Sequence, residues 1–285
     1  MEPPVQSLIF GLGAALAWGI HDVCIRHVSQ RMAILPMMAI ILGAGLLAMA
    51  PFVVFHGDWS GLGGQALSLA ILAGLVYAAA GFSLYRAFSI GPVRLVAPIV
   101  GSFPVLSVLW AALQGQPPTP GQAIAILAIV GGVGAIAALS DETAEKADKR
   151  GAAIGWALIA ATGFAGTFAI GQAAERAGGG LPSLAITRAV ALAAVLIAIA
   201  VIRPALPGRR GPWALPVAMG LLDALALGLV LTSGSLPRPE YAVVTSSVFG
   251  MVTILLAWAF LREPMRPMQW AGAIIVFSGI GYLAI

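Results

Sequence analysis

Long apolar stretches fill most of the chain and are separated only by short polar or Pro- and Gly-containing breaks. About 20 apolar residues are enough to cross the hydrocarbon core of a bilayer as an α-helix, and a helix satisfies its own backbone hydrogen bonds there. The pattern therefore predicts ten membrane-spanning helices, at residues 6–28, 33–55, 66–88, 93–113, 120–140, 151–175, 181–202, 213–233, 240–261 and 267–285.

The second half of the chain repeats the pattern of the first. Segments 89–98 and 235–244 are each followed by an apolar run, by a Pro-containing break (116–122 and 263–269) and by a second apolar run. The offset of about 146 residues indicates an internal repeat. Because each half has five predicted spans, an odd number, the second half enters the membrane in the opposite direction, as in many transporters.

The predicted fold class is thus an all-α integral membrane protein with ten transmembrane helices in two inverted five-helix repeats. We expect a first repeat at residues 1–140, a cytoplasmic linker at 141–150 and a second repeat at 151–285.

Composition agrees with a membrane protein and excludes several other classes. The chain is 60% hydrophobic and only 9% charged, whereas a soluble domain carries about 25% charged residues. The net charge is +4, but the charged residues are scattered between the apolar runs, so no nucleic-acid partner is expected. A single Cys24 forms no internal disulfide, and three histidines are too few for a histidine-rich metal site, so we expect no metal and no cofactor.

Lys and Arg residues are distributed unevenly between the two sets of loops. One set carries Arg26, Arg31, Arg86, Arg94, Lys146, Lys149, Arg150, Arg203, Arg209, Arg210, Arg262 and Arg266. The opposite set, which includes both termini, carries only Arg176 and Arg238. Because loops rich in Lys and Arg stay in the cytoplasm, this bias predicts extracytoplasmic termini in a bacterial-type inner cell membrane.

Two polar residues at matching places in the repeats mark a candidate site. An ionised group at the bilayer centre costs about 2.5–3.5 kcal/mol, so its presence calls for a reason. Asp223 lies near the middle of the eighth predicted span, and its repeat mate Tyr77 lies at the same depth in the third. Facing each other across a pseudo-two-fold axis, they would form an asymmetric polar pocket. The alternative is that Asp223 makes a structural hydrogen bond to a neighbouring helix.

A second candidate group is His21 and Asp22, late in the first predicted span. Asp22 precedes Arg26 by four residues, so the two side chains share a helix face and are suited to an ion pair. The alternative is a proton or substrate site, because histidine titrates in the physiological range.

Four further residues complete the set of candidates. Arg188, in the seventh predicted span, has a guanidinium suited to a carboxylate, although its long stem also suits it to reaching the headgroups. With Asp223 it would offer both charges to a zwitterion. Trp18 and its repeat mate Phe164 lie in mid-span, where they line a cavity or pack in the core. Ser246 either faces the cavity or bonds to its own helix.

The chain resembles the drug/metabolite transporter superfamily, specifically its ten-helix EamA-type members. The likeness lies in Ala17–Ile20 of the first predicted span, in Gly91–Pro98 at the start of the fourth, and in Leu261–Pro264 followed by Gln269 near the tenth. This resemblance implies transport of small molecules by alternating access, most often export of amino acids, metabolites or drugs. Such proteins commonly have cytoplasmic termini, opposite to the charge bias here. The first repeat also has Gln116 where the second has Glu263.

We therefore expect a secondary active transporter of small amphipathic metabolites, namely amino acids or related zwitterions, or drugs, that is coupled to protons or works by exchange. Predicted spans 1, 3, 4, 6, 8 and 9 would line a central cavity, with Arg188 reaching in from the seventh. The candidate substrate-binding residues are Trp18, His21, Asp22, Tyr77, Phe164, Arg188, Asp223 and Ser246, and the candidate proton carriers are Asp22, His21 and Asp223.

Other functions remain open at this stage. The alternatives are transport of organic cations or of a nucleoside-like metabolite, a channel, and an intramembrane enzyme. An enzyme is not expected, because it would need a nucleophile with a base or a cluster of metal ligands, and only His21 of the three histidines is embedded in a span. Nothing in the sequence resembles a phosphate-binding loop, so we expect no ATP hydrolysis. The expected partners are a small-molecule substrate and the lipid bilayer, with the protein a monomer or a homodimer.

Overall fold

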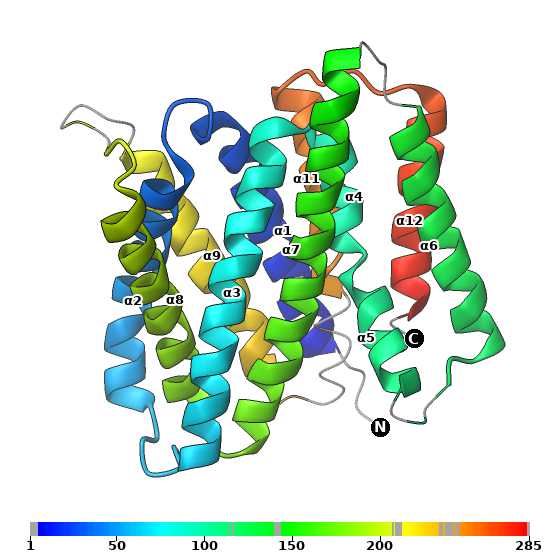
Figure 1. Cartoon of the computed structure of the whole chain (residues 1–285). Coiled ribbons are helices and arrows are strands. Elements are labelled where there is room, and N and C mark those ends of the chain that lie inside the picture. Colours follow the sequence, from blue (N-terminus) through cyan, green and yellow to red (C-terminus); the bar gives the residue numbers. More distant parts are fainter. Residues whose placement is uncertain are drawn as a thin grey trace.

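The computed structural model describes residues 5–113, 115, 117–139, 144–206, 208, 213–233, 236, 242 and 245–283. All regular structure in these residues is helical, which confirms the all-α prediction (Figure 1). The helices are α1 (Val5–Val28), α2 (Ile34–His56), α3 (Gly64–Ile90), α4 (Val93–Gly101), α5 (Phe103–Leu113), α6 (Pro120–Ala138), α7 (Ala144–Arg176), α8 (Gly180–Ile202), α9 (Ala214–Thr232), α11 (Phe249–Phe260) and α12 (Pro267–Leu283).

Six of the described helical segments are long and apolar enough to cross a membrane: Val5–Val28, Ile34–His56, Gly64–Ile90, Pro120–Ala138, Lys149–Arg176 and Gly180–Ile202. Shorter apolar segments cover Val93–Leu106, Ala214–Val230, Phe249–Phe260 and Pro267–Leu283. Nearly every predicted span therefore has a helix in its place. The predicted ninth span, 240–261, lies partly outside the described residues, and α11 forms its second part.

The fourth predicted span is not one helix but two, α4 and α5, separated at Ser102. Proline lacks an amide hydrogen and fits only the first turn of a helix without disruption, and Pro104 is the second residue of α5. In the second half, a turn at Ser247–Val248 immediately precedes α11. Phe103 and Phe249, which are repeat mates, are thus the first residues after equivalent interruptions.

The fifth and tenth predicted spans begin with the same local device. Thr119 precedes Pro120, and Gln122 accepts a hydrogen bond from the Thr119 amide at 2.9 Å. At the start of α12, Gln269 likewise accepts from the amide of Arg266 at 3.0 Å. A side chain that satisfies the amide before the first turn stabilises the start of a helix. This explains why a glutamine ends both breaks of the repeat, three residues after the amide from which it accepts.

The two halves of the chain interlock through paired glycine contacts. A Cβ atom on Gly74 of α3 would lie 2.6 Å from the Thr187 carbonyl oxygen of α8, and one on Gly220 of α9 would collide with the Ile41 carbonyl oxygen of α2. Both contacts join a helix of one half to a helix of the other, and Ile41 and Thr187 are themselves repeat mates. Small residues let helices approach this closely in lipid. In Figure 1, α6 and α12 pack together at one side of the bundle.

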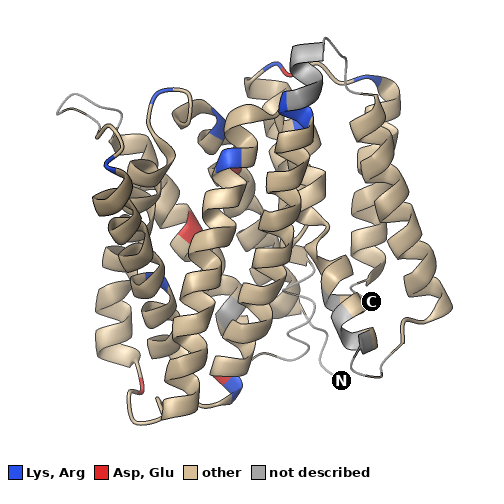
Figure 2. Cartoon of the chain, in the orientation of Figure 1, with Lys and Arg blue, Asp and Glu red and all other residues tan. Residues whose placement is uncertain are grey.

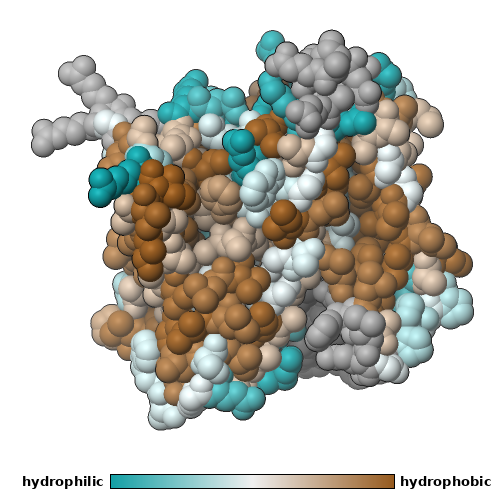
Figure 3. Space-filling view, in the orientation of Figure 1, coloured by the Kyte–Doolittle hydropathy of each residue, from teal (hydrophilic) through white to brown (hydrophobic). Residues whose placement is uncertain are grey.

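The outer surface of the bundle has the pattern of a membrane protein. Figure 3 shows a broad apolar band between hydrophilic ends. Figure 2 shows most Lys and Arg residues of the described chain at one end, at the top of the view, whereas α1 begins and α12 ends towards the other. Arg209, Arg210 and Arg238 of the predicted charge bias lie outside the described residues.

Candidate functional site

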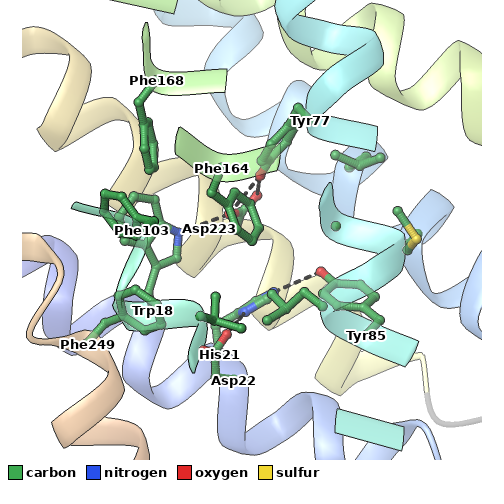
Figure 4. Close-up of a pocket in the computed structure, with 15 residues that line it drawn as sticks. Trp18, His21, Asp22, Tyr77, Tyr85, Phe103, Phe164, Phe168, Asp223 and Phe249 are labelled. Atoms are coloured by element: carbon green, nitrogen blue, oxygen red, sulfur yellow. Dashed lines mark hydrogen bonds and ion pairs between the residues drawn. The ribbon is translucent and has the colours of Figure 1, made fainter. Parts of the chain in front are cut away.

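A cavity lies at the centre of the bundle, between helices of both halves (Figure 4). It contains about 700 Å³ not filled by protein atoms, including the part that is open to the outside. Its walls come from α1, α2, α3, α4, α5, α7, α9 and α11. The lining residues are Trp18, His21, Asp22, Met38, Leu42, Tyr77, Gly81, Leu84, Tyr85, Val100, Phe103, Phe164, Phe168, Asp223 and Phe249.

Aromatic rings form much of the cavity wall. The ring of Trp18 lies 6.0 Å from that of Phe168 and 6.1 Å from that of Phe249, measured between centroids. Phe103 lies 5.2 Å from Phe168, and Phe164 lies one helical turn before Phe168 on α7. Ring separations of 4.5–7 Å are those at which aromatic pairs attract each other. The wall is therefore a connected aromatic surface built from α1, α5, α7 and α11.

Asp223 is the centre of a hydrogen-bonded group at one side of the cavity. The Tyr77 hydroxyl donates to its Oδ2 at 2.7 Å and to its Oδ1 at 3.0 Å. The Trp18 indole donates to Oδ1 at 3.1 Å, and Arg188 donates to Oδ2 at 2.8 Å. Both oxygens of Asp223 are thus bound by donors from three other helices, α1, α3 and α8. Its negative charge is compensated by the guanidinium.

Arg188 lies behind Asp223 and does not line the cavity. Its side chain is completely buried and packs against Gly45 of α2, where a Cβ atom would collide with Nη2. Nε and Nη2 have no hydrogen-bond partner among the described residues. The repeat mate Leu42, by contrast, does line the cavity. Arg188 therefore does not extend to the headgroups, and it is bonded to Asp223 instead of lining the cavity.

A second polar group consists of Asp22, His21 and Tyr85 (Figure 4). His21 lies between the other two: its Nδ1 is 3.1 Å from Asp22 Oδ1, and its Nε2 is 3.1 Å from the Tyr85 hydroxyl. All three side chains are buried, with His21 only 3% exposed. Asp22 Oδ2 is buried and has no hydrogen-bond partner among the described residues. Asp22 is also one of the residues that line the cavity, so an acceptor without a partner lies at the cavity wall.

Arg26 does not form the ion pair with Asp22 that its spacing allowed. Instead its Nη1 donates to the carbonyl oxygens of Phe88 and Ser89, both at 2.9 Å, at the end of α3. The last carbonyls of a helix lack partners within it and attract cations. Arg26 therefore caps α3, and Asp22 is left without a cationic arginine or lysine among the described contacts.

The cavity differs from the prediction in several members. Ser246 is buried just before the interruption that precedes α11, and it does not line the cavity. The prediction did not include Tyr85, Phe103, Phe168 and Phe249, nor the contribution of α2 through Met38 and Leu42. Helical spacing was an available signal for two of them, because Phe168 follows Phe164 by four residues and Tyr85 follows Tyr77 by eight. No group of three potential metal ligands occurs among the described residues.

Glu263 connects the loop before α12 with the start of α4. Its Oε1 accepts from the amide of Val93 at 3.1 Å and its Oε2 from the amide of Arg94 at 3.3 Å. A carboxylate at a helix N-terminus satisfies free amides and interacts favourably with the helix dipole. A residue of the second half therefore holds a helix of the first half that carries Val100 to the cavity.

Comparison with known proteins identifies the family. A model of the EamA-like transporter family matches the chain twice, at residues 6–138 and 151–285. The chain belongs to the EamA-like transporter family, of the drug/metabolite transporter superfamily, as the sequence motifs indicated. It is therefore a multi-pass membrane protein from a family of transporters.

The fold is also known from other structures. A solved structure, described only as the crystal structure of a protein, is similar to this chain with a TM-score of 0.67. The similarity covers 98% of this chain and 96% of the other at 14% sequence identity, which establishes a shared fold. A comparison with curated proteins finds no match.

Proposed function

We propose that this protein is a secondary active transporter of small amphipathic solutes that carry an ammonium group and an apolar or aromatic portion. The family supports the transport class, and the lining of the cavity supports the solute class. The observation that carries the proposal is Asp22, which lines an aromatic cavity and whose buried Oδ2 has no hydrogen-bond partner among the described residues. The solute would cross the membrane chemically unchanged.

The aromatic wall suits both parts of such a solute. The rings of Trp18, Phe168 and Phe249 offer apolar surface, and an ammonium group within about 6 Å of a ring face gains about 0.5–2 kcal/mol from cation–π attraction. The Asp22 carboxylate would accept the ammonium hydrogens. A cavity with mostly apolar walls and few polar groups is typical of a site for small molecules.

The positions of the two carboxylates favour a cation over a zwitterion. A zwitterion needs a cationic group for its carboxylate, and Arg188 was the candidate for this role. Arg188 is buried behind Asp223 and bound to it. Among the described residues that line the cavity there is no arginine or lysine to bind the carboxylate of a zwitterion, whereas Asp22 can accept from an ammonium group. We therefore favour organic amines and cations over amino acids.

Alternating access is the mechanism that we propose for this transport. Ten membrane crossings in two inverted repeats would place the cavity at the pseudo-two-fold axis, as in other transporters built from inverted repeats. The paired glycine contacts and the matched interruptions at Ser102 and Ser247–Val248 support this arrangement. A rocking of the interlocked halves would then open the cavity to each side in turn.

We also propose that the arginine-rich end faces the cytoplasm, which places both termini outside it. The test uses a Cys24→Ser background with one new cysteine, at Gln30 near the arginine-rich end or at Ser60 near the other. A membrane-impermeant maleimide added to intact cells should label the Ser60→Cys variant and not the Gln30→Cys variant. The reverse pattern would mean the opposite insertion.

Counterflow in proteoliposomes tests the proposed function. Vesicles would be loaded with unlabelled solute and supplied with labelled 2-phenylethylammonium, phenylalanine or phenylacetate. We expect accumulation of the amine, little of the amino acid and none of the anion. Asp22→Asn should lower amine counterflow at least tenfold, whereas the matched variant Asp58→Asn, in an exposed loop, should not change it. Preferential uptake of the anion, or normal amine uptake by Asp22→Asn, would contradict the proposal.

A further inference from the structure

We propose that the Asp22–His21 pair holds one proton when the cavity is empty and releases it when the cationic solute binds, so that the protein exchanges a proton for its solute. This inference rests on the proposed function and adds the coupling ion and its site. It follows from a difference between the two buried carboxylates that line the cavity: Asp223 is paired with Arg188, whereas Asp22 bonds only to His21 among the described side chains.

Asp223 has a fixed charge balance. Arg188 compensates its charge at 2.8 Å, and Tyr77 and Trp18 donate to its oxygens. Adding a proton to Asp223 would leave the guanidinium of Arg188 buried without a counter-charge, which is strongly unfavourable. This pair therefore keeps a net charge of zero throughout the cycle.

Asp22 has no fixed counter-charge. Arg26, the nearest candidate along the helix, is bound to carbonyl oxygens of α3 instead. The only side chain that bonds to Asp22 among the described residues is His21, which can be neutral or cationic. An uncompensated carboxylate is costly away from water. The Asp22–His21 pair is thus the part of the cavity whose charge can change.

Because of charge balance, the Asp22–His21 pair binds either the proton or the cationic solute, but not both. With one proton, the pair is neutral overall, either as a carboxylic acid beside a neutral imidazole or as a carboxylate beside an imidazolium. With an ammonium group bound to the Asp22 carboxylate, the charges of the solute and of the pair without the proton again sum to zero. Binding both would leave an uncompensated positive charge, and binding neither would leave an uncompensated negative one. The two cations therefore compete.

His21 also offers the proton a route. Its Nδ1 contacts Asp22 and its Nε2 contacts the hydroxyl of Tyr85, which lines the cavity from α3. A proton taken up at Nε2 and one given up at Nδ1 can pass through the ring without a rearrangement of the helices. The other titratable or charged groups that act on this trio are Cys24 on α1, Tyr77 on α3, Arg188 on α8 and Asp223 on α9.

The test measures protons released when a permanent cation binds to the purified protein. Benzyltrimethylammonium carries an aromatic ring and a charge that cannot be lost, so any proton released comes from the protein. In weakly buffered detergent solution, at an acidic pH where the pair is protonated, we expect a pH-sensitive dye to report about one proton released per bound cation. In the acidic range where the pair is protonated, the Kd of the cation should rise about tenfold for each unit by which the pH falls.

Three variants identify the source of the proton. Asp22→Asn should release no proton and should bind the cation weakly, with a Kd that no longer depends on pH. His21→Gln keeps the carboxylate and should still bind, but over a different pH range. Asp58→Asn is the matched control and should behave as the unchanged protein. Hydrogen bonds from the Ser60 hydroxyl and amide hold the pKa of the Asp58 carboxyl below its ordinary value, so it is ionised at neutral pH.

The outcomes separate the two proposals. Binding that releases no proton and has the same Kd from pH 5 to pH 8 would overturn proton exchange and leave the proposed solute class standing. No binding of benzyltrimethylammonium or of 2-phenylethylammonium at any pH would overturn the proposed function and the exchange with it. If Asp22→Asn does not fold, His21→Gln decides: proton release and a pH dependence identical to those of the unchanged protein would overturn the role of the pair.

Discussion

Tyr77 and Asp223 are 146 residues apart, and the Tyr77 hydroxyl donates to both Asp223 carboxylate oxygens, at 2.7 and 3.0 Å. They are repeat mates, one on α3 and the other on α9. Two mates can touch each other only close to the pseudo-two-fold axis that relates the repeats, so this contact locates the axis at the cavity. Because one mate is a phenol and the other an acid, the repeats are equivalent in position but not in charge.

Replacing Tyr77 with Phe should weaken the bundle at this point. Asp223 would lose its two contacts with the phenol and keep those with Trp18 and Arg188. A hydrogen bond to a charged group within a membrane bundle contributes about 1–2 kcal/mol, so the midpoint of thermal unfolding in detergent should fall by a few degrees. Tyr282→Phe, at an exposed tyrosine, serves as the control. An unchanged midpoint in Tyr77→Phe would mean that this hydrogen bond does not stabilise the fold.

Removing either member of the Arg188–Asp223 pair alone should be more harmful than removing both. Arg188→Leu introduces the residue found at the mate position, Leu42, and leaves Asp223 without its counter-charge. The loss of one partner of a buried pair costs about 3–5 kcal/mol. We expect the double variant Arg188→Leu/Asp223→Asn to unfold at a higher temperature than either single variant. Additive losses in this cycle would contradict a direct coupling between the two residues.

Gly220→Ala should separate α9 from α2. A Cβ atom at this position would collide with the Ile41 carbonyl oxygen and lie 2.9 Å from the Ala44 Cβ. A carbonyl of a helix backbone cannot move aside as a flexible side chain can, so folded yield should fall strongly. Gly43→Ala on α2 is the matched control, because a Cβ atom there meets nothing within 4 Å. The control should be neutral or more stable by up to about 1 kcal/mol, from helix propensity.

Glu263→Gln should loosen the start of α4. The amide side chain keeps one oxygen for the amides of Val93 and Arg94 but loses the negative charge that favours this helix end. Loss of such a cap costs about 0.5–2 kcal/mol. We expect faster hydrogen exchange in the first turn of α4, measured by mass spectrometry, with little change in α12. Unchanged exchange in α4 would show that the charge of Glu263 is unimportant there.

Much of the fold could be predicted from the apolar pattern, because a helix in lipid must be long and apolar along its whole length. The interruption of the fourth predicted span had a local signal in Pro104, which fits the first turn of a new helix better than the middle of an old one. Its counterpart before α11 had no such signal, because the mate of Pro104 is Gly250. That break depends on packing with the rest of the bundle.

The candidate site was predictable only where symmetry fixed the distances. The repeat offset was enough to bring Tyr77 and Asp223 together. The partners of Arg188 and Arg26 could not be predicted, because spacing within a helix indicates which groups share a face but not what lies opposite that face. Arg188 reaches Asp223 because Gly45 leaves room for it, and Arg26 reaches α3 because the end of that helix is close by.

The Arg188–Asp223 pair has an electrical consequence for a protein that moves within a membrane. A lone charge that shifts across the membrane potential gains or loses about 2.3 kcal/mol per 100 mV. Because these opposite charges lie 2.8 Å apart, they travel together as a dipole and cancel almost all of that work. In the proposed alternating-access cycle, the membrane potential would therefore do little work on this pair and more on the charge at Asp22.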